Sequence, residues 1–278
     1  MLDNHMALKN GLRVFIGSLL LLAISYVIYV VRYPMWSITS PVELPYIGMF
    51  LTYFAVFAVA LVLIKKDMKA KLTDIFKFKD ARIVLLGLLL AVLFQVMYFG
   101  LTLLLGGKID SATFANSTLA SLPLALTIYF LYGSFGAFAE EVAYRAYSVS
   151  RIASKYGYGV AIFVSTILFS LQHIHIFQAS WLVEYFFQLQ FIHVLLFGIF
   201  VGYFFKKSKG NLWAVVAFHV LKNIIDMALP IYASAPSVYM HWVVNILSFT
   251  ALMVILRILP FNKLMKTGKI EADILEPV

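Results

Sequence analysis

The chain has 278 residues, of which 63% are hydrophobic and only 13% are charged. A soluble domain has about 45–50% apolar and about 25% charged residues, so this composition places the chain in a lipid bilayer. The absence of cysteine excludes disulfides, thiolate metal sites and a cysteine nucleophile. The net charge of +9 does not indicate a nucleic-acid partner, because no basic patch interleaved with aromatic residues accompanies it.

Eight apolar segments approach the roughly 20 residues that a helix needs to cross about 30 Å of hydrocarbon. In chain order they cover residues 13–31, 46–64, 83–105, 123–144, 158–176, 185–205, 211–229 and 241–259. The first segment is longer than the roughly 7–15 residues of a signal peptide's apolar region, which favours a transmembrane helix. We therefore predict one all-α, polytopic membrane domain over residues 1–278, with about eight transmembrane helices.

The lysines and arginines support this map. If the N-terminus is cytoplasmic, all but three of the 22 fall in cytoplasmic segments, including Arg145 in a loop over residues 145–157. The exceptions are Arg32 and Lys108 on the opposite side and Lys222 within a helix. We predict that both termini are cytoplasmic and that these cations face anionic lipid headgroups.

Ionisable groups inside membrane helices are costly and are candidates for a functional site. The first cluster, residues 140–145, lies late in the fourth segment and reads Glu-Glu-Val-Ala-Tyr-Arg. Glu141 and Arg145 stand four residues apart and can pair on one helix face. Glu140 points about 100° away, so it is left to face a cavity. Alternatively, both carboxylates cap the cytoplasmic end of the helix near Arg145 and Arg151.

The second cluster lies in the fifth segment, where Phe169-Ser170-Leu171-Gln172-His173 is followed by His175. A lone histidine inside a membrane more often hydrogen-bonds a neighbouring helix than takes part in a reaction. His193, in the sixth segment, is assigned to packing.

The third cluster forms one polar stripe on the seventh segment. Its members at i, i+3, i+4 and i+7 are His219, Lys222, Asn223 and Asp226. Such a stripe must face protein or a water-filled cavity. Lys222 and Asp226 can neutralise each other, which leaves His219 and Asn223 directed at one place. Simple hydrogen bonding between helices is the alternative.

Together these clusters provide the groups that activate water and stabilise an oxyanion. No serine lies in a strained elbow between a strand and a helix, and the HExxH zinc signature is missing.

The three motifs, Glu140-Glu141-x-x-x-Arg145, Phe169-x-x-x-His173 and His219-x-x-x-Asn223, resemble those of the CPBP family. This family contains the type II CAAX prenyl proteases and the Abi-type bacteriocin-processing or immunity proteins. The resemblance covers about residues 120–230, which it marks as the catalytic core. It implies a bundle of about eight membrane helices around a polar cavity, and an endopeptidase that cleaves peptides or lipidated proteins at the membrane.

The resemblance also implies roles for the motif residues. Glu140 matches the catalytic carboxylate, and His173 would help to hold and polarise a water molecule. His219 and Asn223 match the second histidine motif, as oxyanion donors or metal-site residues. The remaining first-motif residues, Glu141 and Arg145, would position Glu140.

Two routes to hydrolysis stay open. In a metal-free route, which we favour slightly, Glu140 acts as the general base. In the other, Glu140, His173 and His219 ligate one zinc ion and leave an open position for water. Asn223 would be a poor zinc ligand but a good amide donor.

Other functions fit some of these features. A non-catalytic immunity protein or modulator of a sensor kinase would not need the complete set of motif residues. A transporter could use Lys222 and Asp226 as a proton-coupled pair, but no Gly- or Pro-broken helices recur in two halves. For a protease, a prenylated CAAX protein, a peptide pheromone, a bacteriocin precursor and a lipoprotein signal remnant are all compatible substrates.

The predicted boundaries separate two of the motif residues. At 1.5 Å per residue, Glu140 lies near the cytoplasmic end of its helix and His173 lies well across the bilayer. They can meet only if the fifth helix starts after residue 158, or is broken or tilted. An irregular or amphipathic stretch over Arg151–Gly159 would allow this.

Overall fold

The computed structural model describes residues 12–27, 43–109, 133–174, 190–228, 233–234 and 238–264. Its helices are Leu12–Val27, α2 (Glu43–Lys66), α3 (Leu72–Ile75), α4 (Ala81–Leu104), residues 133–141, the π-helix η2 (Val142–Val149), α7 (Ser150–Gln172), α9 (Gln190–Lys207), α10 (Leu212–Ala228), α11 (Val238–Ile258) and α12 (Phe261–Leu264). The two-residue strands β1 (Lys108–Ile109) and β2 (Ala233–Ser234) pair antiparallel. The predicted all-helical fold is confirmed.

Three of the described helical runs are long and apolar enough to cross a bilayer, judged by length and composition. They are Ala81–Leu104, Gly133–Gln172 and Tyr239–Ile258. Large apolar side chains on their outer surfaces, such as Val96 and Phe163, are more than 60% exposed. Such a surface is stable against lipid and would be an aggregation hazard in water. A total of eight spans stays a prediction.

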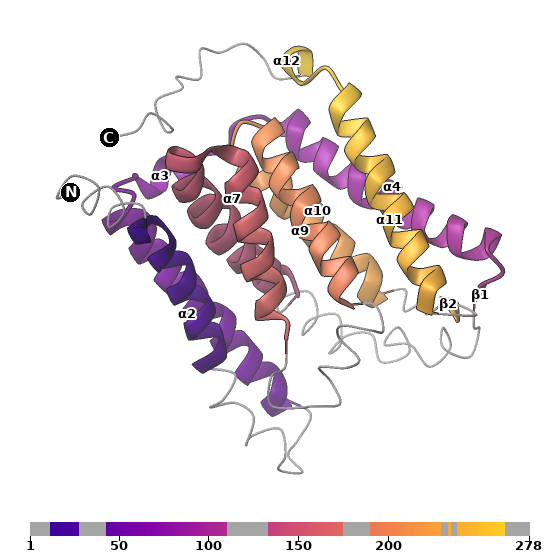
Figure 1. Ribbon diagram of the computed structural model, residues 1–278, viewed down its shortest axis with the longest axis horizontal. Helices are drawn as coiled ribbons and strands as arrows, with labels where there is room; N and C mark the ends of the chain where they lie inside the picture. The colour runs from indigo at the N-terminus through magenta and orange to yellow at the C-terminus, as the bar shows by residue number, and fades with distance from the viewer. Residues whose placement is uncertain are drawn as a thin grey trace, which may run out of the picture.

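The long helices lie side by side in one bundle, with α9 and α10 between α7 and α11 (Figure 1). α10 packs against α4, while α9 packs against both α7 and α11. Gly87 permits the close approach of α4 to α10, because a Cβ at this position would lie 2.3 Å from the carbonyl oxygen of Ala214. α10 is thereby held in the interior, where its polar stripe meets the neighbouring helices.

A helical hairpin over residues 133–172 corrects the predicted boundaries. The fourth helix does not end at residue 144 but continues through η2 to Tyr156, and the chain reverses at Gly157. Gly157 has φ 76° and ψ 164°, a backbone conformation that is open essentially only to glycine. The reversal sets the register of the two arms of the hairpin.

This register brings Glu140 and His173 together. Glu140 precedes Gly157 by 17 residues and His173 follows it by 16, which corresponds to about 25 Å and about 24 Å of helix. Both residues therefore lie at the same depth. The separation that the predicted boundaries implied disappears, because the basic stretch after residue 144 is helix rather than loop.

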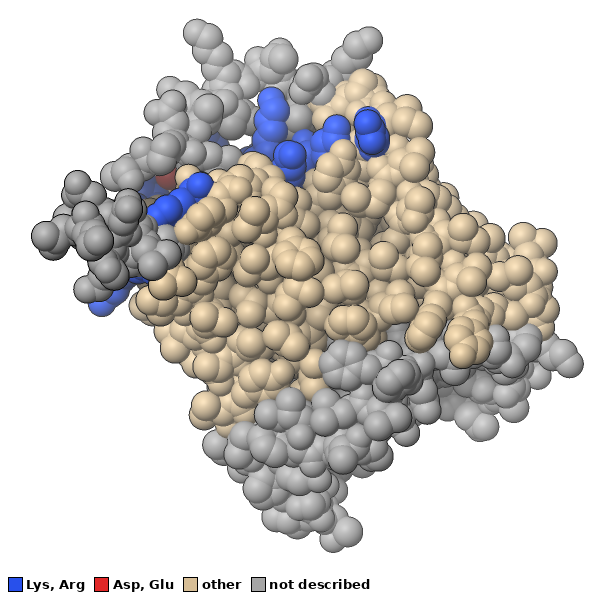
Figure 2. All heavy atoms as spheres, viewed as in Figure 1, with Lys and Arg blue, Asp and Glu red and all other residues tan. Residues whose placement is uncertain are grey.

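Lysine and arginine side chains gather at one end of the molecule (Figure 2), which we call the basic end. It contains the cations that end α2 and α9, those just before and at the start of α4, and one in the turn between α9 and α10, namely Lys65, Lys66, Lys206, Lys207, Lys79, Arg82 and Lys209. Two contacts tie it together: Arg151 pairs with Asp67 at 2.8 Å, and Lys79 Nζ donates to the Gly210 carbonyl at 3.2 Å. The expectation that Arg145 belongs to this surface is wrong, because its side chain is only 1% exposed.

Candidate active site

A cavity of about 240 Å³ lies between the helices and is lined by at least one polar residue from each of the three motifs. Its polar lining consists of Tyr53 from α2, Glu140, His173, His193 from α9, and His219, Lys222 and Asn223 from α10. Apolar walls come from Phe169, Val194 and Phe197. The cavity therefore combines hydrogen-bonding groups with surface suited to apolar side chains.

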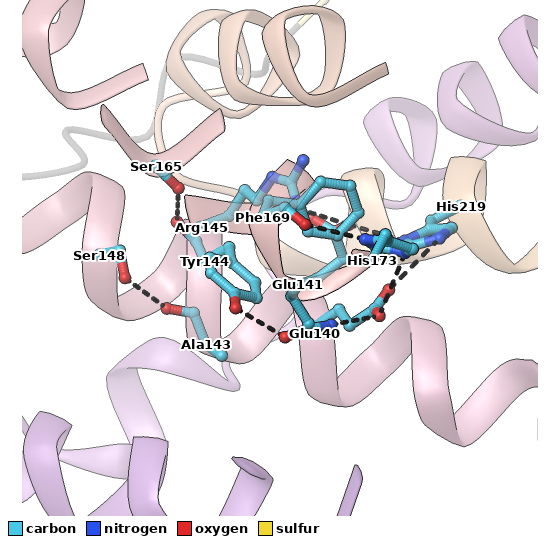
Figure 3. A network of polar contacts seen from close by, with 11 residues as sticks. Glu140, Glu141, Ala143, Tyr144, Arg145, Ser148, Ser165, Phe169, His173 and His219 are labelled. Atoms are coloured by element: carbon cyan, nitrogen blue, oxygen red, sulfur yellow. Dashed lines mark hydrogen bonds and ion pairs between the residues drawn. The ribbon is translucent and has the colours of Figure 1, made fainter. Parts of the chain in front are cut away.

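The Glu140 carboxylate faces two imidazole rings, those of His173 and His219 (Figure 3). Its Oε1 atom is 3.9 Å from His173 Nε2, and its Oε2 atom is 3.8 Å from His219 Nε2. The amide nitrogen of Gln172 donates a hydrogen bond of 2.8 Å to Oε1. The carboxylate is 4% exposed, so it is a buried acid whose two oxygens face different histidines.

The contacts at Nδ1 determine which nitrogen each histidine turns toward Glu140. His173 Nδ1 lies 2.8 Å from the Phe169 carbonyl oxygen, and His219 Nδ1 lies 2.7 Å from Glu141 Oε1. Both of these oxygens can only accept, so Nδ1 carries the proton in each ring. In the neutral form, each ring then presents the Nε2 lone pair to the cavity.

Glu141 and Arg145 form a fully buried ion pair. Glu141 Oε1 is 3.2 Å from the Arg145 guanidinium, and the side chains are 0% and 1% exposed. The guanidinium stacks over the Phe169 ring, with Cζ 4.5 Å from its centre. The expected division, in which Glu141 pairs and Glu140 faces a cavity, is observed. The alternative of two carboxylates capping the cytoplasmic end is wrong, because both lie within the bundle.

A supporting hydrogen-bond network was not expected from the sequence. The Tyr144 hydroxyl donates to Gln172 Oε1 at 2.6 Å, which directs the amide nitrogen of Gln172 at Glu140. Ser25 Oγ donates to the same Gln172 oxygen at 3.3 Å, so helix 12–27 also supports the site. The one available signal was Gln172 itself, an amide beside a motif histidine within an apolar run.

The remaining polar residues of the late helices also find partners. Lys222 pairs with Asp226 at 2.6 Å as the i,i+4 spacing predicts, and Asp226 also accepts a hydrogen bond from Gln95 on α4. His193 Nδ1 lies 2.6 Å from Asn245 Oδ1 on α11. This contact fits the predicted packing role of His193, but the residue also lines the cavity. His175 lies outside the described residues.

The three predicted zinc ligands are chemically suited to a metal, but the distances between their atoms are longer than in a tetrahedral zinc site. Two tetrahedral zinc ligands, each about 2.1 Å from the ion, stand about 3.4 Å apart, whereas the two distances here are 3.8 and 3.9 Å. Both rings donate Nδ1–H to an oxygen, as metal-bound histidines do. Within the described residues, no group of three His, Asp or Glu side chains is already arranged to hold an ion. A metal site of Glu140, His173 and His219 stays a prediction.

Residues 121–225 match the family described as Type II CAAX prenyl endopeptidase Rce1-like. The matched region contains all three motifs, and it confirms the resemblance to the CPBP family. The part of the helical bundle that carries the buried polar site is thus similar to a domain of a membrane protease family. That family is the CAAX-type intramembrane proteases, which are hydrolases. A search of curated proteins finds no match to the chain.

Proposed function

We propose that this protein is an intramembrane endopeptidase that cleaves a membrane-associated peptide or protein with an activated water molecule. The position of Glu140, with one histidine facing each of its oxygens, is the observation that carries the proposal. Separations of 3.8 and 3.9 Å are too long for direct hydrogen bonds. A water molecule beside Glu140 and His173 would donate one proton to each of these acceptors and keep a lone pair for attack.

Glu140 is the general base of the proposed reaction. It accepts a proton from water as the water oxygen bonds to the peptide carbonyl carbon, and the carbonyl oxygen becomes an oxyanion. Glu140 then returns the proton to the peptide nitrogen as the carbon–nitrogen bond breaks. A positioned acid–base group of this kind contributes about 10²–10⁴-fold to a rate.

Asn223 and His219 are the proposed partners of the oxyanion. The Asn223 amide can donate directly, and removal of one such donor costs about 2.7–4 kcal/mol in comparable enzymes. His219 can donate from Nε2 only when its ring is protonated. The Glu141 carboxylate accepts a hydrogen bond from Nδ1 and so fixes the orientation of the ring.

If the site binds zinc, Glu140, His173 and His219 are the residues that would hold it. The metal would polarise the peptide carbonyl and make its bound water more acidic. Glu141 and the Phe169 carbonyl would then orient the two ligating rings.

Peptidomics of membranes tests the proposed activity. Cells that lack the gene are complemented with the wild-type chain, with Glu140→Gln, or with Asp74→Asn as a control for neutralising an acid at the basic end. Peptides produced by the wild type and the control, and missing with Glu140→Gln, are the expected result. Glu140→Gln could instead restore a cellular phenotype while the peptides stay the same as in cells that lack the gene. That result would favour a non-catalytic membrane partner.

A further inference from the structure

We infer that Tyr53, on a helix outside the region that matches the protease family, is a positioning residue that holds the Glu140 carboxylate throughout the proposed reaction. The matched region covers residues 121–225, whereas Tyr53 lies in α2. The inference rests on the proposed function, in which Glu140 takes a proton from water and later returns it. Three relationships between α2 and the helix that carries Glu140 support it.

The first relationship is aromatic packing of α2 against helix 133–141. Phe50 and Phe57 of α2 both contact Phe135, with ring centres 5.1 and 5.8 Å from the Phe135 ring. Tyr53 follows Phe50 by three residues and precedes Phe57 by four, so the three side chains share one face of α2. The Tyr53 ring is therefore on the face that packs against helix 133–141.

The second relationship is the space that Gly136 leaves for this ring. A Cβ at Gly136 would stand 2.9 Å from Tyr53 Cε2, so any larger residue would displace the ring. Gly136 precedes Glu140 by four residues and lies one turn away on the same face of its helix. The Tyr53 ring thus occupies the space beside the turn that leads to the carboxylate.

The third relationship is a contact with the carboxylate itself. The Tyr53 side chain is a hydrogen-bond partner of Glu140, and both residues line the cavity. Gln172 is the other partner, since its amide nitrogen donates to Glu140 Oε1 at 2.8 Å. Glu140 is therefore held by a phenol from α2 and by an amide from α7.

These two partners respond differently when Glu140 changes its protonation state. The amide nitrogen of Gln172 can only donate a hydrogen bond, whereas a phenol hydroxyl can donate or accept. Tyr53 therefore donates to the ionised carboxylate, and it can accept from the carboxylic acid that forms when water gives up its proton. No proton passes through Tyr53. Its hydroxyl turns about the C–O bond, so the contact is kept while Glu140 takes the proton and passes it to the peptide nitrogen.

Tyr53→Phe tests this role, because it removes the hydroxyl and keeps the ring beside Gly136. On the peptide substrate identified by peptidomics, kcat should fall about 10–100-fold with KM unchanged, as expected for loss of a hydrogen bond to a charged group. Tyr98→Phe is the matched control. The Tyr98 hydroxyl also has a partner within the bundle, His241 Nδ1 at 3.1 Å, but Tyr98 is not among the described residues that line the cavity. This control should keep the wild-type kcat.

Gly136→Ala is a second test that removes no polar group. The added Cβ should displace the Tyr53 ring and lower kcat, but it should lower kcat little further in a chain that already carries Tyr53→Phe. The loss of thermal stability should be similar in both chains, because the two rings meet the same Cβ. Gly100→Ala is the control for adding a methyl group to a helix, since a Cβ there would meet nothing within 4 Å.

The contact can also be measured without activity. The shifts in melting temperature caused by Tyr53→Phe and Glu140→Leu should be non-additive in the double variant, whereas those of Tyr98→Phe and Glu140→Leu should add. Additive shifts for Tyr53 and Glu140 would overturn the inference, and so would a wild-type kcat, or a change in KM alone, for Tyr53→Phe.

Failure of the proposed function would look different. Wild-type turnover by Glu140→Gln would refute the role of Glu140 as the base, whatever Tyr53→Phe does. An inactive Glu140→Gln beside a fully active Tyr53→Phe would refute only the role of Tyr53. The melting temperatures need no substrate, so they decide whether Tyr53 and Glu140 are in contact even if no cleaved peptide is found.

Discussion

His219 Nδ1 lies 2.7 Å from Glu141 Oε1, and this contact joins the third motif to the first across two helices. The same carboxylate oxygen is 3.2 Å from the guanidinium of Arg145. Glu141 therefore orients a cavity-lining histidine and neutralises a buried arginine at once. A buried charge that loses its partner is strongly destabilising, so the pair is expected to behave as one unit.

Substitutions in this pair should be coupled. Glu141→Ala and Arg145→Ala should each lower the stability by about 3–5 kcal/mol, because each leaves an uncompensated charge in the bundle. The double substitution should cost clearly less than the sum of the two. Thermal unfolding in detergent measures the three changes, and strict additivity would show that the residues are not coupled.

Glu140→Gln should abolish proteolysis and leave the fold intact. The change keeps the size of the side chain and removes the base, so the rate should fall by about 10²–10⁴-fold. Turnover by purified protein is the measurement, with expression level and melting temperature as checks on folding. Turnover at the wild-type rate would refute the assignment of Glu140 as the base.

The sequence predicted those features of the site that depend on local helix geometry. Four-residue spacing was sufficient to anticipate the Glu141–Arg145 and Lys222–Asp226 pairs, and the 100° step was sufficient to turn Glu140 away from Glu141. These relations follow from one helix and do not depend on how the helices pack.

The contacts between helices could not be predicted in this way. Arg145 and Arg151 suggested a cytoplasmic loop, because a list of charges does not reveal that the Arg145 guanidinium stacks over the Phe169 ring or that Arg151 binds Asp67 on another segment. The support of Glu140 by Gln172 likewise depends on the register of the hairpin, which a single backbone conformation at Gly157 sets.

Gly157→Ala should therefore destabilise the protein. An alanine at φ 76° and ψ 164° costs about 1–3 kcal/mol, and any shift of the turn moves His173 relative to Glu140. Gly159→Ala is a matched control two residues further on, where a Cβ would meet nothing within 4 Å. The control should be neutral or slightly stabilising. Equal melting temperatures for the two variants would argue against a strained turn at Gly157.

The eight-helix map predicts the side from which labels react. Cysteines at Lys66, Lys206 and Lys269 should react from the cytoplasmic side only, and cysteines at Lys108 and Ser234 from the other. Ser208 would otherwise be a natural probe of the turn after α9, but it is 2% exposed, so the exposed Lys206 is the better position. Any one of these positions reacting from the opposite face would contradict the map.

The third motif distinguishes the two routes to hydrolysis. If Asn223 and His219 donate to an oxyanion, Asn223→Ala should slow the chemical step by about 10²–10³-fold with little change in KM. Activity should then survive exhaustive chelation, and purified protein should contain no stoichiometric metal.

Zinc ligation by His219 predicts a different pattern. Chelation should abolish activity and added zinc should restore it, and His173→Ala or His219→Ala should lose the bound metal. Asn223→Ala should then keep the metal and lose less of the rate, because an amide is a poor zinc ligand. Elemental analysis of the wild type and these three variants, alongside turnover, separates the routes. One equivalent of zinc that disappears with either histidine would overturn the metal-free route, and the Nδ1 contacts to Glu141 and the Phe169 carbonyl would then be the interactions that orient the ligands.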